Sequence, residues 1–156
     1  MTLNLSKNGA DLIKHFEGLR TKAYKCPAGI WTIGYGHTGV DVKPGDIITK
    51  TRADELFNKD IARFVAAVNR LVKVTVSQDL FDALVSFCYN TGEATLAKST
   101  LLKVVNKKSD NYAISTQFRR YIYGGGKKLA GLVRRREAEV LLANGMPWKT
   151  AATLTD

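Results

Sequence analysis

The side chains best suited to catalysis in this sequence are Glu17, Cys26 and Thr32, which lie within one short stretch. Glu17 falls at the predicted end of a helix, and the hairpin predicted after it returns the chain on itself. Cys26, near the turn, and Thr32, on the second strand, can then both face Glu17 across a cleft. The spacing predicts that these residues line one wall of an active site.

Acid catalysis is the chemistry that this set could perform. A glutamic acid in a partly desolvated cleft has a raised pKa and stays protonated near neutral pH, as a general acid for a glycosidic oxygen must. A threonine hydroxyl could hold the water that attacks the opposite face of the sugar. Each residue taken singly also fits a plain structural role, because a glutamate at a helix end is commonly solvated and threonine favours strands.

The first elements that must position these residues are a helix and a small sheet. Ser6 and Gly18 are of the types that begin and end a helix, and apolar residues at helical spacing between them predict one buried face. Glycines then punctuate β-prone runs that predict a twisted antiparallel sheet. These runs are Lys22–Lys25, Ile30–Tyr35 and Asp46–Thr49.

From Thr51 onward the pattern is helical. Thr51 and Asp54 resemble a capping box, and they open a long amphipathic helix, up to Leu71, that we expect to join two lobes. Further helices are predicted from Ser77 to Gly92, over Thr100–Lys107 and Asn111–Tyr121, and over Leu129–Ala143 after a flexible Gly124–Gly126 turn.

These elements predict an α+β fold in a single domain. We expect a sheet lobe at about 19–50 and a larger helical lobe formed by about 51–156 and the N-terminal helix. The groove between two such lobes is the expected place for a site.

Composition limits the class of protein. The chain has 156 residues, with 24 Lys and Arg against 14 Asp and Glu, which gives a formal net charge of +10. With 45% hydrophobic residues it is predicted to be globular, and no apolar run approaches the roughly 20 residues of a membrane helix. Met1–Lys7 does not have the pattern of a secretory signal, so we expect synthesis in a reducing cytoplasm that keeps Cys26 and Cys88 as thiols.

Several segments together resemble the bacteriophage-type lysozymes, the endolysin muramidases of glycoside hydrolase family 24. They are Phe16–Gly18, Ala23–Lys25, Thr32–His37, Leu56–Asp60, Asn90–Gly92, Ser99–Leu102 and Gly131–Arg136. The resemblance covers nearly the whole chain and is most specific between Glu17 and Thr32. It implies a lysozyme-like fold and hydrolysis, without a cofactor, of the β-1,4 bond between N-acetylmuramic acid and N-acetylglucosamine in peptidoglycan.

The resemblance also implies roles for individual residues. Glu17 would be the general acid of a reaction that inverts configuration, Thr32 would position water, and Cys26 occupies a position that is Asp in many relatives. A thiol with a pKa near 8.5 is mostly neutral at pH 7, so Cys26 could supply charge, act as base or nucleophile, or only position a group. Implied substrate-binding residues are Thr38, Tyr89, Asn90 and Thr100.

His37 and Cys88 have plainer interpretations. A lone histidine without partner ligands at suitable spacing argues against zinc, and we expect His37 to pair with Asp60 and tie the sheet to the long helix. Cys88 lies on the apolar face of a predicted core helix, where packing is its expected role.

The positive charge predicts an anionic partner but does not select one. One alternative to the enzyme is a basic module that binds nucleic acid or an anionic membrane. It rests on the net charge and on Arg119, Arg120, Lys127, Lys128, Arg134, Arg135 and Arg136. The resemblance favours peptidoglycan over nucleic acid as the partner. It also implies that the enzyme depends on a holin to reach the periplasmic cell wall from the cytoplasm. We expect a monomer whose basic C-terminal third can also contact the anionic outer membrane.

Overall fold

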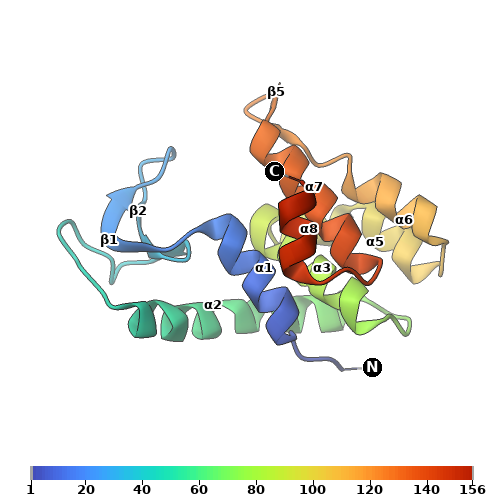
Figure 1. Ribbon diagram of the computed structural model, residues 1–156, viewed down its shortest axis with the longest axis horizontal. Coiled ribbons are helices and arrows are strands. Elements are labelled where there is room, and N and C mark those ends of the chain that lie inside the picture. The colour runs from blue at the N-terminus through green and yellow to red at the C-terminus, as the bar shows by residue number, and fades with distance from the viewer. Residues whose placement is uncertain (1, 156) are drawn as a thin grey trace. The chain divides into compact units, whose positions relative to one another are not determined.

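The structure, a computed structural model, describes residues 2–155 and divides into two compact units (Figure 1). The smaller unit is Ile13–Arg63, and the larger combines Met1–Leu12 with Phe64–Asp156. Helices α1 (Lys7–Glu17) and α2 (Lys50–Leu71) each contribute to both units. The mixture of helices with a small antiparallel sheet confirms the predicted α+β class.

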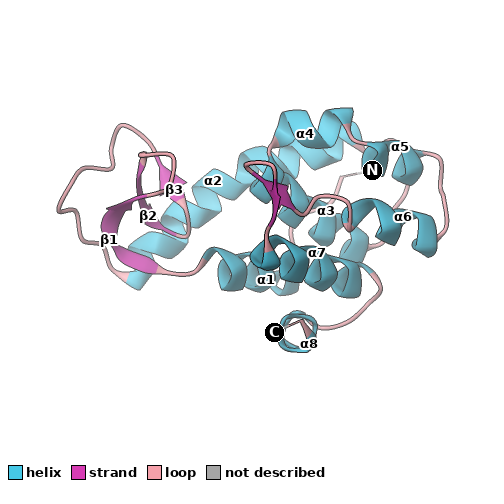
Figure 2. Ribbon diagram, turned by 90° about the horizontal axis from the view of Figure 1, so that it is seen from above, coloured by secondary structure: helices cyan, strands magenta, loops and turns pink. Residues whose placement is uncertain are grey.

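The smaller unit is built on a sheet of three antiparallel strands in the order β1–β2–β3, drawn in magenta in Figure 2. Its strands are β1 (Arg20–Lys25), β2 (Trp31–Gly34) and β3 (His37–Thr38). One face of the sheet packs in a core with α2 and the loop after β3. The buried members of this core are Ala23, Ile33, Val42 and Leu56, and Trp31 and Ile48 pack against them.

The predicted third strand at Asp46–Thr49 was wrong. That segment runs beside β1 but forms only an isolated bridge between Ile47 and Lys22. The third strand is instead His37–Thr38, because Gly34 and Gly36 have positive φ angles of 68° and 84° and let the chain reverse directly after β2.

Local capping explains where α1 and α2 begin. Ser6 Oγ accepts a hydrogen bond from Gly9 N at 3.1 Å, and Gly18 ends α1 with φ of 74°, as predicted. The predicted Thr51–Asp54 capping box was wrong, since Thr49 Oγ1 accepts from Arg52 N at 3.1 Å. The Asp54 carboxylate instead binds two lysine ammonium groups, those of Lys14 at 3.1 Å and Lys50 at 2.9 Å.

The larger unit is almost entirely helical. Its elements after α2 are α3 (Gln78–Thr91), α4 (Glu93–Lys98), α5 (Thr100–Asn106), α6 (Asn111–Phe118), β4 (Tyr123–Gly124), β5 (Lys127–Lys128), α7 (Ala130–Ala143) and α8 (Trp148–Leu154). Helix α3 is the core helix that the sequence predicted, since residues 81–88 are all buried and α7 packs against it. Its caps are the predicted ones: Ser77 Oγ accepts from Leu80 N at 3.1 Å, and Gly92 follows its end.

Helices α4 and α8 were not predicted. The short α4 fits between the Gly92 and Ser99 caps of its neighbours, and α8 starts directly after Pro147, which the sequence analysis took only as a stop signal. The Gly124–Gly126 segment was predicted as a flexible turn, but it is part of a two-stranded hairpin in which Gly125 and Gly126 have φ angles of 57° and 79°.

The N-terminal segment is bound into the larger unit by contacts between residues distant in sequence. Leu3 N donates to Asn69 Oδ1 at 2.9 Å, and Ser6 N donates to the buried Asp82 carboxylate at 3.1 Å. At the other end of the chain, Trp148 N donates to Asn8 Oδ1 at 2.9 Å. Both ends of the chain therefore complete the same unit.

Within residues 2–155, no helix has the length and apolar character needed to cross a membrane.

Candidate active site

A tight hairpin places Cys26 beside Thr32 in the smaller unit. Cys26 N donates to Ile30 O at 2.9 Å and Gly29 N donates to Cys26 O at 2.8 Å, and these bonds close the loop of residues 26–30 between β1 and β2. Gly29 takes a φ of 79° that suits glycine at this loop position. The strands pair Tyr24 with Thr32, so Cys26 and Thr32 are diagonal neighbours on the sheet face opposite the Ala23 and Ile33 core.

The hairpin also controls the ionisation of Cys26. The Ile30 N–H lowers the pKa of the thiol most strongly, burial opposes this, and the Ala28 N–H and the Thr32 hydroxyl lower it further. The net direction is a pKa below the ordinary cysteine value, and the thiol is half-buried. The Thr32 hydroxyl also donates to Ile30 O at 3.0 Å. Because a hydroxyl has a single proton, Thr32 donates either to that carbonyl or to the Cys26 sulfur.

Glu17 and Thr38 belong to the same unit. Glu17 is the last residue of α1, is half-buried, and is separated from β1 only by Gly18 and Leu19. Thr38 on β3 pairs directly with Thr32 on β2, so the two hydroxyl-bearing side chains share one sheet face, with Thr38 exposed.

The other predicted substrate-binding residues, Tyr89, Asn90 and Thr100, lie in the larger unit. The half-buried Tyr89 ring contacts Phe64 edge-on at 5.1 Å between centroids. Asn90 is exposed and lies on a pocket of about 290 Å³, and Thr100 is the exposed first residue of α5. The residues that line the pocket with Asn90 are Thr91, Thr95, Tyr121, Tyr123, Leu132 and Arg136.

A sequence model of one known family, described as Phage lysozyme, matches residues 14–139. The chain belongs to the phage lysozyme family.

Individual relatives agree with this assignment. The chain is 48% identical over 139 residues to the endolysin of Bacillus phage B103, covering 88% of this chain and 52% of that protein. It is 40% identical to the endolysin of Acyrthosiphon pisum secondary endosymbiont phage 1, covering 90% of this chain and 97% of that protein. The chain spans only 52% and 55% of the length of the endolysins of Bacillus phages B103 and PZA.

Solved structures show the same fold. The muramidase domain of SpmX from Asticaccaulis excentricus has a TM-score of 0.84 and 38% identity, covering 92% of this chain and 99% of that domain. The endolysin from Escherichia coli O157:H7 phage FAHEc1 has a TM-score of 0.83 and 39% identity, covering 92% of this chain and 94% of that one. Both confirm the lysozyme-like fold that the resemblance implied.

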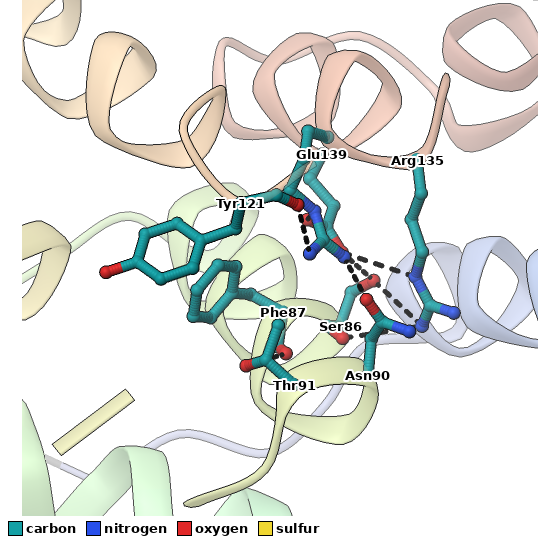
Figure 3. A network of polar contacts seen from close by, with 8 residues as sticks. Ser86, Phe87, Asn90, Thr91, Tyr121, Arg135 and Glu139 are labelled. Atoms are coloured by element: carbon teal, nitrogen blue, oxygen red, sulfur yellow. Dashed lines mark hydrogen bonds and ion pairs between the residues drawn. The ribbon is translucent and has the colours of Figure 1, made fainter. Parts of the chain in front are cut away.

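The Asn90 side chain is hydrogen-bonded to a buried ionic network (Figure 3). The Glu139 carboxylate lies 2.7 Å from Arg136 Nε and 3.5 Å from Arg135 Nε, and it accepts a hydrogen bond from Ser86 Oγ at 2.5 Å. Arg136 also donates to Asn90 Oδ1 at 2.7 Å and lies over the Phe87 ring. Burial lowers the pKa of Arg136, and the Glu139 charge opposes this.

This network corrects the interpretation of the basic residues near the C-terminus. Arg135 and Arg136 are only 4% and 1% exposed, so they do not belong to a surface patch. Glu139 follows them at the i+4 and i+3 positions of α7, which is the helical spacing of ion pairs and the sequence signal for this arrangement.

His37 is buried between two carboxylates of the smaller unit. Its Nδ1 lies 2.7 Å from Asp60 Oδ2, as predicted, and its Nε2 lies 3.1 Å from Asp41 Oδ2, a partner that was not predicted. Burial lowers the pKa of His37, but the hydrogen bonds to Asp60 and Asp41 outweigh it, and the net direction is upward. Within residues 2–155, no group of three or more His, Cys, Asp or Glu side chains is arranged so that it could hold a metal ion.

We predict that Asp60→Asn lowers the His37 pKa and destabilises the protein by about 1.5 to 3 kcal/mol at pH 5, the usual range for hydrogen bonds to charged groups. Because the folded pKa is raised, the stabilisation is complete below the unfolded value of about 6.5 and is lost as the pH rises through the folded value. NMR titration of His37 and urea unfolding at pH 5 and pH 9 measure both effects. A wild-type His37 pKa at or below the unfolded value would refute the pairing.

Proposed function

We propose that this member of the phage lysozyme family is an endolysin that hydrolyses the β-1,4 bond between N-acetylmuramic acid and N-acetylglucosamine, and so lyses the host cell. The family match and the endolysin relatives support this activity. The observation that carries it is the hairpin, which brings Cys26 and Thr32 together on one sheet face in the unit that also contains Glu17.

In the proposed mechanism, Glu17 protonates the glycosidic oxygen as the bond to the anomeric carbon breaks. A water molecule bound at Thr32 attacks the opposite face of the sugar, which inverts its configuration. The proton that this water loses passes to the Cys26 thiolate or, where the sulfur only orients Thr32, to solvent water. While the Thr32 hydroxyl donates to Ile30 O, its lone pairs are left to accept a hydrogen bond from that water. Thr38, Tyr89, Asn90 and Thr100 are the proposed substrate-binding residues.

Two kinds of role are open to Cys26. Its lowered pKa increases the thiolate fraction, and a thiolate could stabilise positive charge at the anomeric carbon or act as base or nucleophile. Alternatively, the sulfur only orients the Thr32 hydroxyl and its water.

We predict that Cys26→Ala loses about 10²-fold in hydrolytic rate, the lower end of an acid–base contribution, whereas Cys26→Asp keeps substantial activity. Cys26→Ser separates the two roles, because a hydroxyl keeps the polarity but ionises far less readily than a thiol. Rates on purified peptidoglycan at several pH values measure this, with Cys88→Ala as a buried control thiol. A fully active Cys26→Ala protein would leave Glu17 and Thr32 as the working pair.

The activity itself is tested by product analysis. Digestion of purified peptidoglycan should release fragments with muramic acid at the reducing end, and chloroform-treated Gram-negative cells should lose turbidity. A basic module that only binds nucleic acid or membrane would leave both substrates unchanged.

We also propose that the enzyme acts as a monomer, reaches the cell wall with the help of a holin, and is drawn toward the anionic envelope by its net charge of +10.

A further inference from the structure

The basic residues between Arg119 and Arg136 differ in their partners within the protein. No Asp or Glu occurs between Asp110 and Glu137, so this stretch is purely basic in its charges. Three of its arginines nevertheless face carboxylates within the protein. Arg119 forms a two-point contact with Glu137 at 2.6 and 3.2 Å, and the buried Arg135 and Arg136 surround Glu139.

Four others, Arg120, Lys127, Lys128 and Arg134, are all exposed, and Arg120 donates a hydrogen bond to Gln117. In the part of the chain that the structure describes, no carboxylate forms an ion pair with any of them. The two lysines form β5 of the hairpin, which is labelled in Figure 1, and Arg134 lies in the second turn of α7. Three exposed cations without a carboxylate partner therefore lie at the hairpin and the start of α7.

Apolar side chains are exposed among these charges. Lys128 and Arg134 line a depression of about 440 Å³ with the apolar Ala130 and Val133 and with Thr155. Three large exposed residues neighbour this lining. Tyr123 pairs with Lys128 across the hairpin, Leu129 follows Lys128 in the chain, and Leu154 precedes Thr155. Their exposed fractions are 63% for Tyr123, 43% for Leu129 and 64% for Leu154. We call Tyr123, Lys127, Lys128, Leu129, Arg134 and Leu154 the hairpin surface.

We propose that the hairpin surface binds the anionic phospholipid face of a membrane. Unpaired lysine and arginine side chains bind lipid phosphates, while neighbouring apolar side chains enter the boundary between headgroups and acyl chains. Charge alone would also attract nucleic acid, but phosphate contacts with nucleic acid leave exposed leucines without a role. The exposed Leu129 and Leu154 beside the cations therefore favour lipid over nucleic acid.

The test uses the complete protein and sedimentation with vesicles of phosphatidylcholine, alone or mixed with phosphatidylglycerol. We expect binding to the mixed vesicles only, and weaker binding at high salt. Each basic side chain next to an anionic bilayer strengthens binding about fivefold, so Lys128→Ala/Arg134→Ala should bind roughly 30-fold more weakly. Leu154→Ser should weaken binding about tenfold through lost apolar contact.

Matched variants control for net charge and for exposed apolar area. Lys103→Ala/Lys107→Ala removes the same charge from exposed positions of α5 and its end, and Ile47→Ser removes an exposed apolar side chain from the smaller unit. Both should bind like the wild type, and all variants should hydrolyse purified peptidoglycan at the wild-type rate.

Three results would overturn the proposal: no binding to the mixed vesicles, equal loss in the α5 control, or unchanged vesicle binding in Leu154→Ser. The surface would instead be assigned to nucleic acid if the protein bound duplex DNA as tightly as the mixed vesicles and if Leu154→Ser changed neither kind of binding. Because peptidoglycan hydrolysis is measured separately, failure of the lipid proposal and failure of the proposed enzymatic function give different outcomes.

Discussion

Glu17→Gln is expected to slow peptidoglycan hydrolysis by about 10²- to 10⁴-fold while the protein stays folded. Glutamine has nearly the same shape as glutamic acid but no proton to give to the glycosidic oxygen. The position at the end of α1 is half-buried, so a change without loss of volume should leave packing intact. Release of reducing ends from purified peptidoglycan measures the rate, and thermal unfolding monitors the fold.

Asp11→Asn is a matched control for this substitution, because it makes the same chemical change on the same helix. Asp11 forms an ion pair with the exposed Lys7 at 2.7 Å, which contributes about 0 to 1 kcal/mol. Its hydrolytic rate should match the wild type. A folded Glu17→Gln protein that keeps a tenth or more of wild-type activity would remove Glu17 from the role of general acid.

Glu139→Gln is expected to destabilise the protein by about 3 to 5 kcal/mol, the usual cost of removing one partner from a buried ion pair. The substitution leaves the Arg136 guanidinium group buried without the charge of Glu139 beside it. For a domain of this size the loss corresponds to a fall in Tm of about 10 °C. Urea unfolding and thermal unfolding at neutral pH measure it.

Glu137→Gln tests whether burial causes that effect. Glu137 neighbours Glu139 along α7 and also pairs with an arginine, but its contact with Arg119 is partly exposed and should contribute only about 0 to 1 kcal/mol. A loss below about 1 kcal/mol in Glu139→Gln, equal to that of the control, would show that the buried charges do not depend on Glu139.

The helix caps show how far the sequence alone predicts the fold. Ser77, Ser99 and Asp110 each accept a hydrogen bond from a backbone N–H within their own first turn, so the signal is local and was read correctly. The prediction of Thr51 as the helix cap failed because Thr49 and Thr51 are equally suitable capping residues in the sequence. In the structure, Thr49 accepts the capping hydrogen bond from Arg52 N. The strand at Asp46–Thr49 failed because pairing depends on what lies beside a segment as well as on its β-propensity.

The candidate site divides in the same way. The neighbourhood of Cys26 and Thr32 follows from a short hairpin, and the contact between His37 and Asp60 was also predicted. The burial of Arg135 and Arg136 could not be predicted from the run of arginines, because it depends on Ser86 and Asn90 of α3, far away in the sequence. The sequence shows that a side chain is charged, but only the packing of the folded protein determines whether that side chain is buried or exposed to solvent.

The larger unit has a consequence for synthesis on the ribosome, because it joins the two ends of the chain. Asn8 receives its hydrogen bond from Trp148, 140 residues later, while Ile13–Arg63 is a continuous segment. The residues of the smaller unit therefore emerge in one stretch, but Asn8 lacks its partner until Trp148 has been made. In that interval the larger unit is incomplete, and incompletely packed units are open to chaperones or aggregation. Chains that stop before Trp148 would remain in that state.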